Sequence, residues 1–166
     1  MVRLAHKRTM TTDNICIHIE VKGVVQGVGF RPFVHRLALT HQLKGFVLNH
    51  AQGVTIEIEG PERSTYFFLK DLRSMPPPAA HIVSIETQSL SHQGHLDFKI
   101  LKSDAITSHK TVPVSADLNL CQDCLKELWN AKDRRYFYPF INCTNCGPRF
   151  SLIKDVPYDR QLTTMA

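Results

Sequence analysis

Three glycines within seven residues, at positions 23, 27 and 29, separate two stretches of different periodicity. Before them, residues 15–21 alternate between branched apolar and other side chains, which is typical of a half-buried strand. After them, apolar residues recur at helical spacing from Phe30 to Thr40. The glycines therefore belong to a tight loop between a strand and a helix, where the backbone adopts conformations that other residues avoid.

Composition leaves two interpretations of this loop open. Its N–H groups, the free N–H groups of the helix start and the guanidinium of Arg31 could together bind a phosphate or another oxyanion. Alternatively, the loop is a plain turn and Arg31 is a solvated side chain. The loop lacks the Gly-Lys-Ser/Thr of a nucleotide-binding P-loop and the spacing of the dinucleotide fingerprint, so neither nucleotide motif decides between them.

The remaining periodicities predict the fold. We expect strands at residues 45–49 and 54–59 joined by a hairpin turn, a second helix after Pro61, and two further strand segments at 82–87 and 96–100. The order is β-α-β-β-α-β with a short extra strand. It predicts an α+β fold, the ferredoxin-like (split βαβ) sandwich, with an antiparallel sheet and both helices on one face.

Individual residues of this part carry further expectations. In the strand at 54–59, alternation predicts that Val54, Ile56 and Ile58 point into the core. It predicts that Thr55, Glu57 and Glu59 point outward. Cys16 stands alone on the first strand and is expected to be an inert, packed thiol. Histidines near the first helix and hairpin have no evident partner, so we expect surface or capping roles for His35, His41 and His50.

Two segments show no regular pattern. Residues 1–13 are basic without a following apolar stretch, so we expect a disordered leader and no secretory signal. Residues 102–120 contain Ser, Thr and Pro without regular periodicity and are expected to be a linker. No apolar run approaches the length of a membrane span, and the net charge of +5 favours anionic ligands.

Four cysteines follow the linker as two C-x-x-C pairs separated by 18 residues, namely Cys121, Cys124, Cys143 and Cys146. This spacing is typical of a four-cysteine zinc site, and four thiolate ligands leave no open position for catalysis, so we expect structural zinc. With no signal peptide, a reducing cytoplasm is the expected location. The alternative of redox-active pairs expects a thioredoxin-like strand and helix beside each pair, which the sequence does not show.

Basic and aromatic residues alternate between the two cysteine pairs. Such a pattern could bind nucleic acid by stacking and phosphate contacts, but in a module this small the aromatics are more simply its core, which is the interpretation we favour. The residues are Trp129, Lys132, Arg134, Arg135, Tyr136, Phe137, Tyr138 and Phe140.

The glycine loop and the strands after it resemble the acylphosphatase family. Residues 25–31, Val-Gln-Gly-Val-Gly-Phe-Arg, match its phosphate-loop motif, and residues 45–49 with 53–57 look like its second signature. The resemblance implies an acylphosphatase-like domain over residues 14–101, in which Arg31 holds the phosphoryl oxygens and Asn49 orients the attacking water. It also implies that the phosphate lies within the backbone of Val25, Gln26, Gly27, Val28, Gly29 and Phe30.

The chain as a whole resembles the N-terminal part of the HypF-type carbamoyltransferases, which act in [NiFe] hydrogenase maturation. Residues 30–38, the cysteine pairs and residues 139–149 carry this likeness, and residues 158–160 and 163–165 fit the segment leading to a second finger. The resemblance implies hydrolysis of carbamoyl phosphate, and it makes residues 121–166 the four-cysteine zinc finger together with the start of the connection to a second finger. Because the chain stops at Ala166, we expect it to lack the domains that pass the carbamoyl group to the partner HypE.

Two alternative functions stay open. A free-standing acylphosphatase with a zinc appendage would differ in substrate preference. A ferredoxin-like domain with a basic finger could bind RNA, but the first and third strands lack the aromatic platform that stacks bases, which argues against nucleic acid.

Overall fold

The computed structural model describes residues 14–103, 119–143, 146–147, 152–155 and 160–164. The expected leader (1–13) and most of the expected linker (102–120) lie outside these residues. Within them, no helix has the length and apolar character needed to span a membrane.

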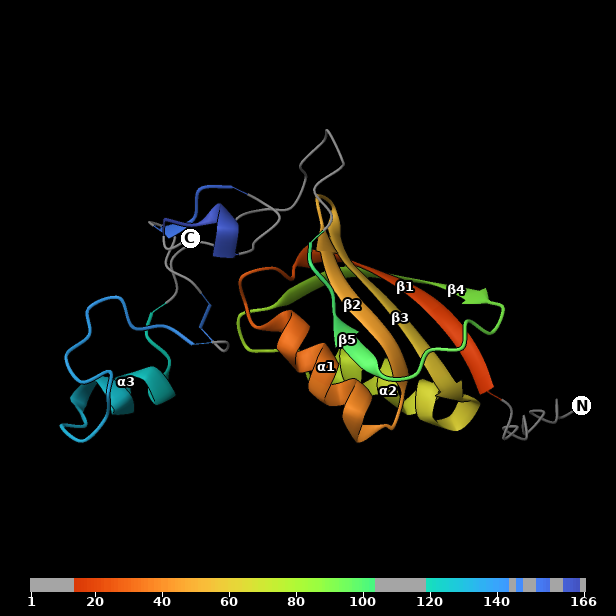
Figure 1. The fold of residues 1–166 in the computed structure, drawn as a ribbon, viewed down its shortest axis with the longest axis horizontal. Coiled ribbons are helices and arrows are strands. Elements are labelled where there is room, and N and C mark those ends of the chain that lie inside the picture. Colours follow the sequence, from red (N-terminus) through yellow and green to blue (C-terminus); the bar gives the residue numbers. More distant parts are fainter. Residues whose placement is uncertain (1–13, 104–118, 144–145, 148–151, 156–159, 165–166) are drawn as a thin grey trace, which may run out of the picture.

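A five-stranded sheet forms the larger part of the chain, in the order β4-β1-β3-β2-β5. Its strands are β1 (Asn14–Val24), β2 (Lys44–His50), β3 (Gly53–Pro61), β4 (His81–Leu90) and β5 (Phe98–Ile100). Helices α1 (Phe30–Thr40) and α2 (Glu62–Ser74) lie on one face of the sheet (Figure 1). The ferredoxin-like prediction is therefore confirmed.

The last strand differs from its prediction. β5 pairs with β2 in parallel, so the sheet is not wholly antiparallel. Leu96, expected to be part of the strand's inward alternation, is instead 88% exposed. β5 is a short strand at the edge of the sheet, opposite β4. Phe98 is the residue of this segment that packs into the core.

The core lies between the sheet and the two helices. α1 buries Phe30, Val34, Leu37 and Ala38, the apolar stripe read from its spacing, and α2 buries Thr65, Phe68 and Leu72. Branched residues of the central strands cover them, with Ile19, Val21, Ile56 and Ile58 almost fully buried. This packing fixes the end of β1 and the start of α1, and so the ends of the loop between them.

The opposite face of the sheet is less open than the alternation predicts. Glu57 and Glu59, expected in solvent, are 9% and 4% exposed. The segment after β4 covers them: the N–H groups of Gln93 and Gly94 donate to the Glu59 carboxylate, and His95 contacts Glu57. Although burial raises it, the pKa of Glu59 is lowered by the two backbone hydrogen bonds and by the nearby histidines.

Cys16 and two of the histidines, His41 and His50, lie close to carboxylate side chains. Burial, together with the neighbouring carboxylates, raises the pKa of Cys16 to about 11, so the expectation of an inert thiol holds. His41 and His50 were expected without partners, which is wrong: their Nε2 atoms lie 2.9 Å from the carboxylates of Asp71 and Glu20. Sequence separations of about 30 residues hid these pairs.

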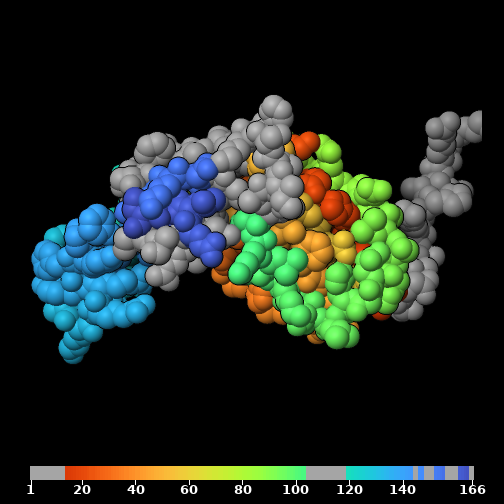
Figure 2. Space-filling view, turned by 45° about the horizontal axis from the view of Figure 1, so that its top comes forward, coloured from red at the N-terminus to blue at the C-terminus, as the bar shows by residue number. Residues whose placement is uncertain are grey.

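The cysteine-rich part forms a lobe beside the sheet domain (Figure 2). It contains α3 (Gln122–Trp129) and the short helix η2 (Arg160–Leu162). Its centre consists of Cys124, Cys146 and Ile141, with Leu120 and Leu128 packed around them.

The aromatic residues between the two cysteine pairs are not the core of this lobe, contrary to our prediction. Trp129 and Phe137 are 61% and 58% exposed, and Tyr136, Tyr138 and Phe140 are exposed as well. The aromatic rings pack edge-on against one another at the surface, because Cys124, Cys146 and Ile141, with the leucines and cysteines around them, already fill the small centre.

Candidate functional site

The glycine loop turns back on itself between β1 and α1. Gly27 and Gly29 have φ values of +71° and +74°, and Gly29 caps α1, accepting the first helical hydrogen bond from Phe33 at 3.1 Å. The side chains of Val25 and Val28 are buried in the core. The valines thus anchor the loop from inside, and Gly27 and Gly29, which carry no side chain, are its partly exposed residues.

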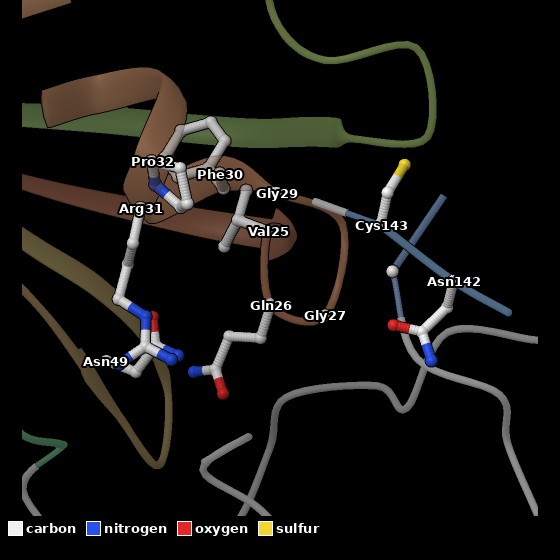
Figure 3. A pocket seen from close by; sticks show the side chains of 11 residues that line it. Val25, Gln26, Gly27, Gly29, Phe30, Arg31, Pro32, Asn49, Asn142 and Cys143 are labelled. Carbon is white, nitrogen blue, oxygen red and sulfur yellow. The ribbon is translucent and has the colours of Figure 1, made fainter. Parts of the chain in front are cut away.

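A pocket of about 330 Å³ opens against this loop. The predicted residues Val25, Gln26, Gly27, Gly29, Phe30, Arg31 and Asn49 all line it, whereas Val28 does not. Arg31 comes from the first turn of α1 and Asn49 from the end of β2, and both line this pocket (Figure 3). The structure thus brings the two predicted catalytic residues to one site.

The electrostatics of the pocket favour an anion. Arg31 is the one charged residue among the described residues that line it, and the first turn of α1 contains no acidic residue. The dipole of α1 adds a partial positive charge at its N-terminal end. The guanidinium of Arg31 lies 3.4 Å from the hydroxyl of Ser103, just beyond β5.

Gln26 has a role that sequence reasoning missed. Its side chain is 5% exposed, and its Nε2 donates hydrogen bonds of 2.8 Å to the carbonyl oxygens of His50 and Gly53. These acceptors belong to the β2–β3 turn that follows Asn49. Gln26 therefore joins the glycine loop to the strand end that carries Asn49, while its backbone lies in the loop.

His50 continues this connection to the other face of the sheet. Its imidazole pairs with the carboxylate of Glu20, which also accepts a 2.6 Å hydrogen bond from Thr55. Although burial raises it, the pKa of Glu20 is lowered by these hydrogen bonds and by nearby histidines. Glu20 therefore stays ionised at neutral pH and keeps His50 in place.

The cysteine lobe forms the far wall of the same pocket. Asn142, Cys143 and Gly147 complete the lining, and Figure 3 shows Asn142 and Cys143 across from Gln26 and Arg31. Sequence analysis did not predict this wall. Nothing in the local pattern of residues 142–147 signals a contact with a loop more than one hundred residues earlier.

The four cysteines meet at one point in the lobe. Their sulfur atoms all lie within 4.8 Å of one another, and the closest separations are 3.4 Å for Cys121 and Cys143 and 3.8 Å for Cys124 and Cys146. Tetrahedral Zn–S bonds of about 2.3 Å place sulfurs about 3.8 Å apart. The donor set and its spacing therefore fit one tetrahedral ion.

Backbone N–H groups close the two turns that carry the sulfur atoms. Cys121 caps α3 by accepting from the N–H of Cys124, and the N–H of Gly147 closes the second turn on the carbonyl of Cys143 at 2.8 Å. Burial raises the pKa of Cys121 and Cys124, but at Cys146 hydrogen bonds outweigh burial and lower the pKa to about 7. A bound ion would hold all four as thiolates.

Comparisons with known proteins agree with this geometry. A model of the acylphosphatase family matches residues 17–100. The acylphosphatase of Thermotoga maritima is 39% identical over 85 residues, which span 51% of this chain and 93% of that protein. The chain belongs to the acylphosphatase family. The HypF finger model matches residues 120–153, so the cysteine lobe is a HypF finger that follows the acylphosphatase domain.

Both parts occur together in the HypF carbamoyltransferases. The chain is 45% identical to the probable carbamoyltransferase HypF of Methanocaldococcus jannaschii over 146 residues, covering 87% of this chain and 19% of that protein. A crystal structure of full-length HypF superposes with a TM-score of 0.87 at 46% identity, over 95% of this chain and 21% of that one. The chain thus spans about a fifth of the length of these relatives. One superposition covers the acylphosphatase domain and the finger, so their arrangement is shared.

Proposed function

We propose that the chain binds and hydrolyses an acyl phosphate, most specifically carbamoyl phosphate. The observation that carries this proposal is the meeting of the glycine loop, Arg31 and Asn49 in one pocket at the start of a helix. Phosphoryl transfer depends mainly on positioning and charge neutralisation, which such a pocket supplies. Support for carbamoyl phosphate comes from the likeness to HypF carbamoyltransferases, one of which is described in a phosphate- and nucleotide-bound form.

The proposed mechanism uses the chain's own groups. Loop N–H groups and the fork of Arg31 bind the phosphoryl oxygens, and the amide of Asn49 orients a water molecule. The oxygen of this water bonds to phosphorus while the bond from phosphorus to the acyl oxygen breaks. The acyl carboxylate leaves with the bonding electrons, and the protons of water pass to phosphate and solvent. An acyl carboxylate is a stable leaving group, so the reaction demands no strong general acid.

The test is phosphate release from carbamoyl phosphate and from acetyl phosphate. Arg31→Ala is expected to lower kcat/KM by about a thousandfold, and Asn49→Ala by about a hundredfold. Arg36→Ala is the matched control, because Arg36 is an exposed arginine of the same helix and its loss changes the net charge equally. Wild-type rates in Arg31→Ala would exclude this pocket as the active site.

The cofactor and setting complete the proposal. We propose that the four cysteines hold structural zinc, which the HypF finger match and the sulfur spacing support. A reducing cytoplasm suits such thiolates. Within a whole carbamoyltransferase, the carbamate released here would serve later domains and finally the partner HypE.

A further inference from the structure

The finger contributes to the anion pocket and not only to its own fold. Asn142, Cys143 and Gly147 line the pocket together with the glycine loop, Arg31 and Asn49. If the loop and Arg31 hold the phosphoryl group, as proposed above, the finger residues on the opposite side of the pocket lie next to the group attached to phosphorus. The acyl end of a substrate would therefore meet the finger wall (Figure 3).

A close backbone contact holds this wall in place. A Cβ atom added to Gly147 would lie 1.5 Å from the carbonyl oxygen of Gly27, so no other residue fits there without displacing one of the two backbones. Gly147 also has a φ of +67°, which disfavours side chains independently. Gly147, which follows the second cysteine pair, is thus in close backbone contact with Gly27 of the glycine loop.

Asn142 is oriented from two sides. Its main-chain carbonyl accepts a 3.0 Å hydrogen bond from Arg135, which pairs with Glu127 of α3. Its Nδ2 donates to the carbonyl of Phe140 at 3.1 Å. With the nitrogen directed at its own turn, the amide presents Oδ1 towards the side of the pocket that Gln26 and Gly27 form (Figure 3).

A hydrogen-bond acceptor at this point distinguishes acyl groups of equal size. Carbamoyl phosphate carries an NH₂ group where acetyl phosphate carries a methyl group, and only the NH₂ can donate to Oδ1. A site that presents a polar partner favours the substrate that can satisfy it over an isostere that cannot. We propose that Asn142 is a specificity-determining residue, which selects acyl phosphates whose acyl carbon bears an N–H donor. This inference rests on the proposed function, because it assumes that the pocket holds an acyl phosphate.

The test uses two stable phosphonates that differ only in that group, carbamoylmethylphosphonate with NH₂ and acetonylphosphonate with CH₃, with inorganic phosphate as a third probe. Calorimetric titration of the zinc-loaded chain is expected to show about tenfold tighter binding of the amide than of the ketone. Asn142→Leu, of similar size, is expected to remove the preference and to leave the affinity for inorganic phosphate within about twofold. Asn142→Asp keeps an acceptor, so it is expected to keep the preference while weakening all three anions.

The outcomes separate this inference from the proposed function. Equal affinity of the wild type for amide and ketone would overturn the role of Asn142, as would an equal loss for all three probes in Asn142→Leu, which would indicate a structural role. A preference that Asn142→Leu abolishes supports the inference even if the chain releases no phosphate from acyl phosphates. That last result would contradict the proposed hydrolysis alone.

Discussion

The side-chain amide of Gln26 donates a 2.8 Å hydrogen bond to the main-chain carbonyl of His50. The same nitrogen donates to the carbonyl of Gly53, so one buried side chain connects the glycine loop to the turn after Asn49. The separation between the loop and Asn49 therefore depends on a residue that need not contact the substrate with its side chain. In the proposed mechanism, Gln26 is therefore a positioning residue for both the glycine loop and Asn49.

Replacing Gln26 by alanine is expected to lower stability and catalysis together. Two carbonyl oxygens would lose a hydrogen-bond donor, which costs about 1–3 kcal/mol of unfolding free energy. Chemical denaturation measures this cost, and phosphate release is expected to fall mainly in kcat, because the loop and Asn49 lose their alignment. Gln88→Ala, at an exposed glutamine of β4, is the control. Unchanged kcat in Gln26→Ala would show that the loop and the turn keep their places without this side chain.

Because Gly147 contacts the glycine loop, adding a methyl group at Gly147 is expected to change anion binding in the pocket. Gly147→Ala is expected to weaken inorganic phosphate binding by about tenfold, because its Cβ would push against Gly27. The control is Gly94→Ala. Gly94 has a similar φ of +76°, and each substitution costs about 1–2 kcal/mol of backbone strain, but a Cβ there meets only His92 at 4.0 Å. Equal phosphate affinities in the two variants would refute the mechanical connection.

Metal removal is expected to act on the anion site as well as on the finger. Chelation should disorder the cysteine turns and so remove the wall at Asn142 and Gly147, with about a tenfold loss of phosphate affinity. By linkage, saturating phosphate should slow metal loss to a chelator by a similar factor. Cys124→Ser is expected to reproduce the apo behaviour and Cys16→Ala to leave metal retention intact, since Cys16 lies in the sheet. A rate of metal loss that does not change with phosphate concentration would contradict this coupling.

Acid is expected to destabilise the domain partly through Glu59. Its folded-state pKa is lowered, so its contribution to stability is present above about pH 4.3, where it ionises in the unfolded chain, and is lost as pH falls through the folded-state pKa. Glu59→Gln should therefore be less stable than wild type at pH 7 and show a shallower loss from pH 5 to 3, measured by denaturation. Glu20, whose pKa is also lowered, follows the same sign. The exposed Glu86→Gln serves as control, and parallel pH profiles of wild type and Glu59→Gln would argue against this role.

Local patterns in the sequence determined most of the fold, and the resemblance to acylphosphatases supplied the proposed roles of the site residues. The change from period 2 to helical spacing at the glycine loop placed β1 and α1 correctly, because backbone periodicity follows from side chains a few residues apart. The loop, Arg31 and Asn49 were predicted through short motifs, and the cysteine ligands through their spacing. Each of these signals lies within one contiguous segment.

Only the tertiary structure decided what happens where distant segments meet. Alternation alone placed Glu57 and Glu59 in solvent, but residues after β4 fold over that face and bury them. The finger aromatics are exposed because cysteines and Ile141 occupy its centre. Gly147 contacts Gly27, a residue 120 positions earlier in the chain. Such a contact depends on how the two packed parts fit together, and no periodic pattern in the sequence indicates it.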